Sequence, residues 1–295
     1  MIGPTREALA DLDAKVKEAL ASGDESRLRV LGYGEISTVV ALTVPEGTFA
    51  CKRLPPFDGR QRYEAYARVF ESYVSALTAR GVVPVESQLS VLDGEGGTVV
   101  AYCVQPILSP DALLPKYFAE CSVDEARAIF RRIASAIDGA VDSRLGIDGQ
   151  LSNWTVSGGE LRYLDLTTPL VRDEHGKDQL DVGLFLASLP WALRGFVRRF
   201  LLAEILDKYF VPRGVMLDLL GNLHKERLGH LIAPFLDELG DRYAPRITLA
   251  ETKAYYADDA RTWSLLLRVR RLDRFWQRHA RRRPYPFLLP GDIRR

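Results

Sequence analysis

The chain has 295 residues, a net charge of +1, and 47% hydrophobic and 27% charged residues, which is typical of a globular protein with a sizeable core. Its three cysteines lie far apart and form no C-x-x-C pair, which argues against a disulfide framework or a zinc knuckle and favours a reducing cytoplasm. No secretory signal peptide is recognisable, and no uncharged run approaches the roughly 18 residues of a membrane span.

The first hundred residues predict a β-rich unit that includes a long helix. Apolar residues at helical spacing predict amphipathic helices over 5–21 and 60–79, the second ending before Gly81. Four segments rich in β-branched or apolar residues predict strands: 39–44, 48–52, 88–92 and 98–104. A connector over 105–111 then leads into the remainder of the chain.

Helical patterns dominate beyond residue 112, apart from one polar hairpin. They cover four segments: 123–141, 190–209, 214–238 and 249–280. We expect an α+β fold with two lobes, a β-rich lobe over 1–106 and a larger, mainly helical lobe over 107–295.

The polar hairpin over 146–169 carries the most informative side chains. Asp148 stands five positions before Asn153, and Asp165 follows a strand pattern that turns back at Gly158-Gly159. A hairpin of this kind brings all three side chains to one end. Their oxygen donors are the ligands that Mg²⁺ prefers when it also holds a phosphate chain, although Asp and Asn are also common in plain turns.

Two earlier features point to phosphate binding. The segment over 31–39 is a strand–turn–strand with two glycines, which permits close approach of the backbone to a phosphate but also suits a tight hairpin. Lys52 lies in an apolar strand, where it either faces solvent at an edge or pairs with a carboxylate of the following helix. Glu71 is our preferred partner, with Glu64 as the alternative on nearly the same helical face.

Taken in order, these motifs resemble the protein-kinase-like superfamily. The order is glycine loop, strand lysine, helix glutamate, connector, D-x-x-x-x-N and strand-end aspartate. The closer likeness is to the small-molecule branch, which includes the aminoglycoside phosphotransferases and choline kinases. The resemblance covers about residues 28–170.

The resemblance implies a site for Mg-ATP. It assigns the phosphate cradle to three residues of the glycine loop: Gly32, Gly34 and Ser37. Lys52, paired with Glu71, would hold the α- and β-phosphates, and backbone groups around Gln105 and Ile107 would meet the adenine ring.

The same resemblance implies the chemistry of the hairpin. Asn153 and Asp165 would bind Mg²⁺, and Asp148 would orient the acceptor hydroxyl and accept its proton. The implied reaction is phosphorylation of a hydroxyl-bearing small molecule by a cytoplasmic, ATP-dependent phosphotransferase.

Departures from the family pattern support an alternative. Gly146 stands where the family carries a histidine, Thr167 replaces the last glycine of D-F-G, and no A-P-E motif follows Asp165. The absent activation segment argues against a general protein substrate. The absent histidine motivates a catalytically weak or inactive kinase-fold partner of a modifying or natural-product enzyme.

The C-terminus is strongly basic. Residues 261–295 contain eleven arginines and two aspartates, a local charge of +9 that leaves −8 for the preceding part of the chain. The pattern predicts a final helix with an arginine-covered outer face, and it suits an acidic partner or substrate. No recognised nucleic-acid-binding module accompanies these arginines.

Overall fold

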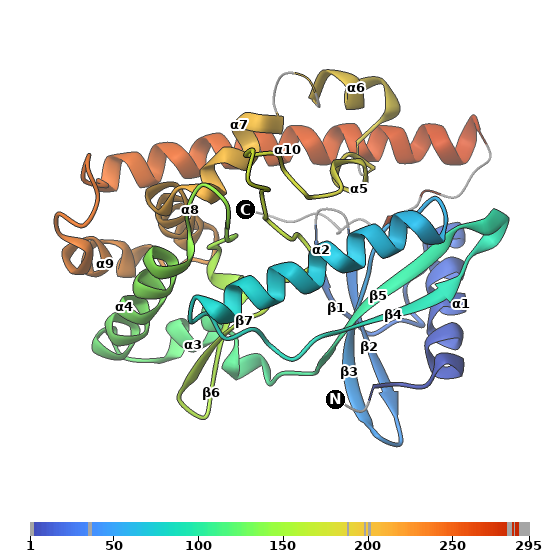
Figure 1. The fold of residues 1–295 in the computed structure, drawn as a ribbon, viewed down its shortest axis with the longest axis horizontal. Helices are drawn as coiled ribbons and strands as arrows, with labels where there is room; N and C mark the ends of the chain where they lie inside the picture. The colour runs from blue at the N-terminus through green and yellow to red at the C-terminus, as the bar shows by residue number, and fades with distance from the viewer. Residues whose placement is uncertain are drawn as a thin grey trace.

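The protein has an α+β fold, seen in a computed structural model in which a five-stranded antiparallel sheet adjoins a large helical region (Figure 1). The structure describes residues 3–34, 37–187, 189–197, 199, 202–281, 285, 287 and 288. All statements below concern these residues.

The sheet occupies residues 30–106 and has the strand order β1-β2-β3-β5-β4. Its strands are β1 (Val30–Tyr33), β2 (Thr38–Val44), β3 (Gly47–Arg53), β4 (Gln88–Asp93) and β5 (Val99–Pro106). The four strands predicted from the sequence are confirmed to within two residues at each end. The register pairs Val39 with Lys52 and Lys52 with Cys103, so Lys52 lies on the third of the five strands.

Both faces of the sheet are covered by helices, α1 (Arg6–Ser22) and α2 (Arg60–Ala79). One half of the β5 side chains belongs to the core cluster that contains α1: Val100, Tyr102 and Val104. The other half belongs to the cluster that contains α2: Val99, Ala101 and Cys103. This alternation follows the two-residue period of a strand and explains why β5 is apolar on both sides.

The two N-terminal helices begin and end close to the predicted positions. Thr5 caps α1 by accepting a hydrogen bond from the Ala8 N–H, and Gly23 ends it in the left-handed region. The bounds of α2 match the predicted 60–79, and Gly81 follows with a φ of 80°.

The remaining helices follow β5. They are α3 (Leu114–Glu120), α4 (Val123–Ala140), α5 (Val182–Leu186), α6 (Trp191–Phe196), α7 (Leu202–Asp207), α8 (Pro212–Lys225), α9 (Ile232–Leu239) and α10 (Leu249–His279). Short 3-10 turns also occur: η1 (Glu95–Gly97), η2 (Pro110–Ala112), η3 (Leu151–Asn153), η5 (Lys208–Phe210) and η6 (Gly229–Leu231). The largest core cluster includes α2, α4, α8 and α9, so its packing continues across the predicted lobe boundary at 106/107.

Two helix predictions need correction. The segment over 214–238 is two helices, because Arg227 adopts a left-handed φ of 62° and the Leu228 N–H returns to the Leu223 carbonyl at 2.8 Å. The break expected at Pro212 is instead the first turn of α8, where a proline loses no helical hydrogen bond. The segment over 190–209 contains α6, α7 and η5, and residues 198, 200 and 201 between α6 and α7 lie outside the described residues.

The last helix, α10, has 31 residues and is about 46 Å long. It extends across the upper side of the molecule in Figure 1, from α9 towards the end near α1. Its first half packs on α8, and near its end Arg278 donates a 2.9 Å hydrogen bond to the Leu20 carbonyl of α1. Among the described helices, none is both long and apolar enough to span a bilayer.

Candidate functional site

The predicted polar hairpin forms as expected. Strands β6 (Trp154–Ser157) and β7 (Glu160–Tyr163) pair antiparallel around Gly158 and Gly159, whose positive φ values of 58° and 80° suit a two-residue turn. The segment before β6 and the segment after β7 therefore meet at one end. A 2.8 Å hydrogen bond from the Leu164 N–H to the Asn153 carbonyl joins them directly.

Asp148 and Asn153 are linked within this end of the hairpin. The Asn153 side-chain amide donates to the Asp148 carbonyl at 3.2 Å, and the Tyr163 hydroxyl donates to the same oxygen at 3.2 Å. The Asp148 carboxylate accepts the Gln150 N–H at 3.1 Å, which fixes the turn. The bond from Asn153 to the Asp148 carbonyl uses the amide nitrogen, and Asn153 Oδ1 accepts no hydrogen bond from a described residue.

Lys52 and Asp165 meet between the sheet and the hairpin. Lys52 Nζ lies 2.8 Å from Asp165 Oδ1, although the two residues are 113 positions apart, and each side chain is 19% exposed. The Thr167 N–H and hydroxyl donate to the same oxygen at 3.1 and 2.9 Å. Burial by itself raises the pKa of Asp165, but the Lys52 charge and these hydrogen bonds hold that pKa below its usual value.

Asp148 has the opposite electrostatic environment. Burial, followed by the nearby carboxylates of Asp218 and Asp165, raises the pKa of Asp148 to about 7. Two carboxyl groups at one end of the hairpin thus differ in acidity because only Asp165 has a lysine partner. A carboxylate with a pKa near neutrality is suited to accept a proton.

Asp218 is a residue of this site that the sequence analysis missed. It is buried on α8, accepts hydrogen bonds from the Lys208 ammonium at 3.1 Å and from the Tyr255 hydroxyl, and its Oδ2 has no partner among the described residues. The one available signal was an acid inside the apolar run Val215-Met216-Leu217-Asp218-Leu219-Leu220. A buried acid that has no partner nearby in the sequence is expected to pair with a residue that lies far from it in the sequence.

The loop that carries Asp148 is held against η5 and α8. The Ile147 N–H donates to the Tyr209 carbonyl at 3.2 Å, and the Gly146 N–H donates to the Leu170 carbonyl at 2.8 Å. A Cβ on Gly146 would lie 2.9 Å from the Tyr209 carbonyl oxygen and 3.1 Å from Leu170 Cβ. A side chain at position 146 would therefore require the Tyr209 backbone and the Leu170 side chain to shift.

Gly146→Ala is expected to destabilise the protein by roughly 1–3 kcal/mol, because backbone on one side and a side chain on the other must both shift. Urea unfolding of both proteins measures the difference in the free energy of unfolding. Gly32→Ala serves as the control, since a Cβ there meets nothing within 4 Å. Equal destabilisation by the two substitutions would contradict the packing argument.

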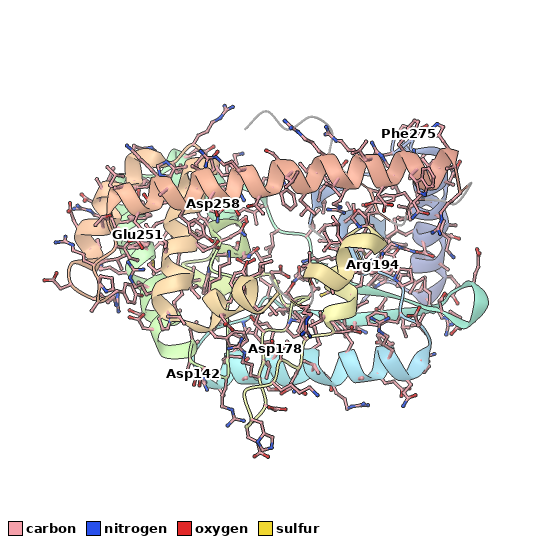
Figure 2. All side chains as sticks on the ribbon, turned by 90° about the horizontal axis from the view of Figure 1, so that it is seen from above. Asp142, Asp178, Arg194, Glu251, Asp258 and Phe275 are labelled. Atoms are coloured by element: carbon pink, nitrogen blue, oxygen red, sulfur yellow. The ribbon has the colours of Figure 1, made fainter. Side chains whose placement is uncertain are left out.

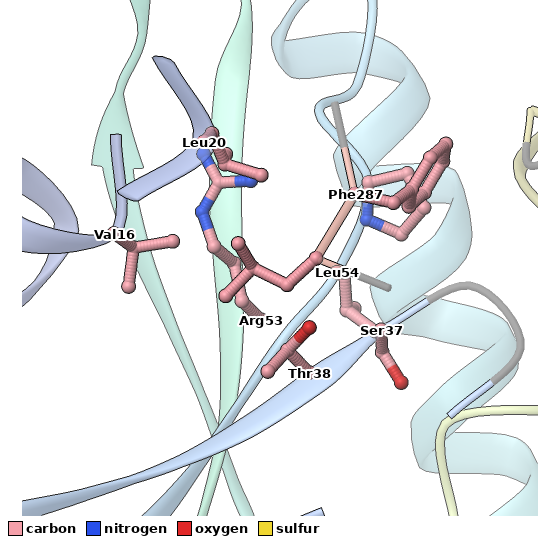
Figure 3. Close-up of a pocket in the computed structure, with 9 residues that line it drawn as sticks. Val16, Leu20, Ser37, Thr38, Arg53, Leu54 and Phe287 are labelled. Carbon is pink, nitrogen blue, oxygen red and sulfur yellow. The ribbon is translucent and has the colours of Figure 1, made fainter. Parts of the chain in front are cut away.

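In the glycine loop, one backbone N–H is already used within the loop. The Gly34 N–H donates to the Ser37 carbonyl at 2.9 Å, and a Cβ on Gly34 would lie 2.7 Å from Ser37 Oγ. Ser37 is buried and lines a small cavity beside Val16, Leu54 and Phe287 (Figure 3). Glu35 and Ile36, at the tip, lie outside the described residues. The expected phosphate-binding roles of Gly32, Gly34 and Ser37 therefore stay predictions.

The expected ion pair between Lys52 and Glu71 is not formed. Glu71 and the alternative Glu64 are both exposed on α2, and the recorded partner of Lys52 is Asp165. The inward positions of α2 carry aromatic residues instead, with Tyr66 and Phe70 buried in the core. The inward face is the apolar stripe that helical spacing predicts for this segment, and both glutamates lie outside it.

The predicted adenine contacts also differ in detail. The Ile107 N–H donates to the Thr48 carbonyl at 3.2 Å, so it is already occupied. The Gln105 side-chain amide donates to Ser87 Oγ and to the Leu164 carbonyl, both at 2.9 Å. Gln105 thus joins the end of β5 to the residue before Asp165, a structural link that was not expected.

The oxygen donors fit a hard cation, but only in part. Within the described ranges, no group of three or more His, Cys, Asp or Glu side chains is arranged to hold a metal ion. The hydrogen bonds of the Asp165 carboxylate with described residues all involve Oδ1, which leaves Oδ2 as a second oxygen donor. Two protein oxygens suit Mg²⁺, which keeps several waters and takes other ligands from substrate phosphates.

The chain was compared with known proteins. A model for a family of unknown function, DUF6206, matches residues 11–274. No curated protein matches the chain.

Proposed function

The chain belongs to the DUF6206 family, and we propose that it is an ATP-dependent phosphotransferase that phosphorylates a hydroxyl group of a small molecule in the cytoplasm. The proposal rests chiefly on one observation, the 2.8 Å contact between Lys52 of the sheet and Asp165 of the hairpin. Kinase-like phosphotransferases need a strand lysine and a metal-binding aspartate in one place.

In this proposal the residues have distinct roles. Lys52 neutralises charge on the α- and β-phosphates, and Asn153 and Asp165 hold Mg²⁺ through their free side-chain oxygens. The bound metal would supply neutralisation of charge on the transferred phosphoryl group. Asp148 accepts the proton of the acceptor hydroxyl while its oxygen attacks the γ-phosphorus and ADP leaves. The pKa of Asp148, raised to about 7, suits this step near neutral pH.

A non-catalytic kinase-fold partner is the second candidate. Three observations favour it: Glu71 is exposed, the Ile107 N–H is occupied by Thr48, and the Gly34 N–H is occupied by Ser37. These groups would have to change partners before they could contact a nucleotide. In this alternative the protein would act by binding a modifying or natural-product enzyme.

Nucleotide binding tests the two candidates. The phosphotransferase is expected to show a rise in melting temperature with millimolar Mg-ATP that disappears with EDTA, together with ADP release stimulated by hydroxyl-bearing acceptors. The second candidate would be favoured by two results together. The melting temperature would rise in a metal-dependent way without turnover on any acceptor, and the Asp148→Asn variant would still bind the partner. If millimolar Mg-ATP produces no shift and no turnover, the phosphotransferase proposal is wrong.

A further inference from the structure

The C-terminal half of α10 exposes a row of large apolar side chains, which we call the outer ridge. Its members are Leu265 (64% exposed), Leu272 (69%), Phe275 (62%) and Trp276 (56%). Phe275 projects from the end of α10 opposite to Glu251 (Figure 2). Side chains of this size are seldom left in water together without a binding role.

Spacing places the ridge on one face of the helix together with arginines. Positions 261, 265, 268, 272, 275 and 279 follow steps of four and three residues, which align on one side of an α-helix. Arg261 and Arg268 belong to this row and are exposed. The one acid between positions 261 and 279 is Asp273, which is half-buried and accepts a hydrogen bond from Gln277. The ridge is therefore both apolar and cationic.

The opposite face of the helix is attached to the body of the protein. Arg270 is 1% exposed, with its guanidinium 5.4 Å from the ring of Phe287, and Arg278 donates to the Leu20 carbonyl. Phe287 and Leu288, which follow α10 in the chain, are buried rather than laid over the ridge. The helix is thus fixed with the outer ridge directed away from the protein.

We infer that the outer ridge of α10 docks this protein on an anionic membrane surface. A helix that lies flat on a bilayer places Leu, Phe and Trp among the headgroups and acyl chains while its arginines contact lipid phosphates. The exposed arginines of this face, Arg261 and Arg268, supply the attraction to an anionic leaflet.

A second copy of the chain is a poorer occupant of this surface. Pairing two outer ridges would bring Arg261 and Arg268 of one copy against a surface with the same charge. A single-stranded nucleic acid would use Phe275 and Trp276 for stacking, but it gives no role to Leu265 and Leu272. An anionic bilayer satisfies both the leucines and the arginines.

Co-sedimentation with lipid vesicles tests this inference. The full chain is expected to bind vesicles of phosphatidylglycerol and phosphatidylcholine, and to bind pure phosphatidylcholine vesicles at least ten-fold more weakly. A triple variant, Leu272→Ser, Phe275→Ser and Trp276→Ser, should lose about ten-fold or more of the binding. Arg261→Gln and Arg268→Gln should each lose about five-fold, with a weaker dependence on salt.

A matched control removes apolar side chains elsewhere on the surface. Val123→Ser and Val211→Ser alter residues that are 42% and 52% exposed, and they should leave vesicle binding unchanged. Helical content and melting temperature should stay the same in the triple variant, because its side chains are exposed. Absence of binding to anionic vesicles would overturn the inference. So would a concentration-dependent dimer that the triple variant abolishes, or an oligonucleotide complex that the triple variant abolishes.

Discussion

Asp148→Asn is expected to lower the rate of phosphoryl transfer by about 100- to 10,000-fold while Mg-ATP binding persists. The amide has the shape of the carboxylate and can still accept the Gln150 N–H, but it cannot take a proton from the acceptor hydroxyl. Steady-state kinetics should show the loss in kcat rather than in the KM for ATP. The wild-type rate should increase as the pH rises through about 7, where Asp148 becomes ionised.

The same substitution should stabilise the fold at alkaline pH. The pKa of Asp148 is raised in the folded protein, so the folded state holds a proton between about pH 4 and pH 7 that the unfolded chain has released. Stability is therefore lost as the pH rises through this window. We expect Asp148→Asn to gain about 2–4 kcal/mol at pH 8 and almost nothing at pH 4.

Urea unfolding at pH 4 and pH 8 measures this gain, and it does so independently of any catalytic activity. Asp11→Asn, at an exposed position of α1, provides the matched substitution for comparison. A wild-type stability curve that is flat between pH 4 and pH 8 would show that the carboxylates around Asp148 do not interact as described. Normal turnover by Asp148→Asn would remove this residue from the mechanism but would leave the stability argument intact.

Asp165→Ala has the second largest expected effect. It removes an oxygen of the proposed metal site, so Mg-ATP binding should fall by a factor of ten or more. It also leaves the Lys52 ammonium without its partner in a partly buried position. We expect a loss of about 1–3 kcal/mol in the free energy of unfolding at pH 7. Because the pKa of Asp165 is lowered in the folded state, this stabilisation is present above about pH 4 and disappears as the pH falls through the folded-state pKa.

A double variant separates the ion pair from the metal site. Lys52→Met together with Asp165→Ala should recover part of the lost stability, because no unpaired charge remains, while Mg-ATP binding stays lost. Thermal unfolding and nucleotide titration of the wild type, both single variants and the double variant complete the cycle. Additive stability losses would mean that the 2.8 Å contact has no energetic consequence.

The sequence by itself determined the local elements of this protein. Runs of β-branched and apolar residues predicted β2, β3, β4 and β5, and apolar spacing followed by Gly81 predicted the bounds of α2. The glycine pair at 158 and 159 predicted the hairpin, because its backbone conformation is strongly favoured by glycine. Asp148, Asn153 and Asp165 could be assigned to one end of this hairpin from the sequence, because these signals are local along the chain.

Only the tertiary structure decided which side chains meet. The partner of Lys52 is Asp165 rather than Glu71, because α2 turns its aromatic face inward and leaves both glutamates exposed. Gly146 is required by the approach of Tyr209 and Leu170, which lie far from it in sequence. Asp218 reaches the environment of Asp148 through the packing of α8, and the outer ridge is exposed because the opposite face of α10 is covered. Contacts of this kind depend on the docking of distant segments, about which helical and strand periodicity carry no information.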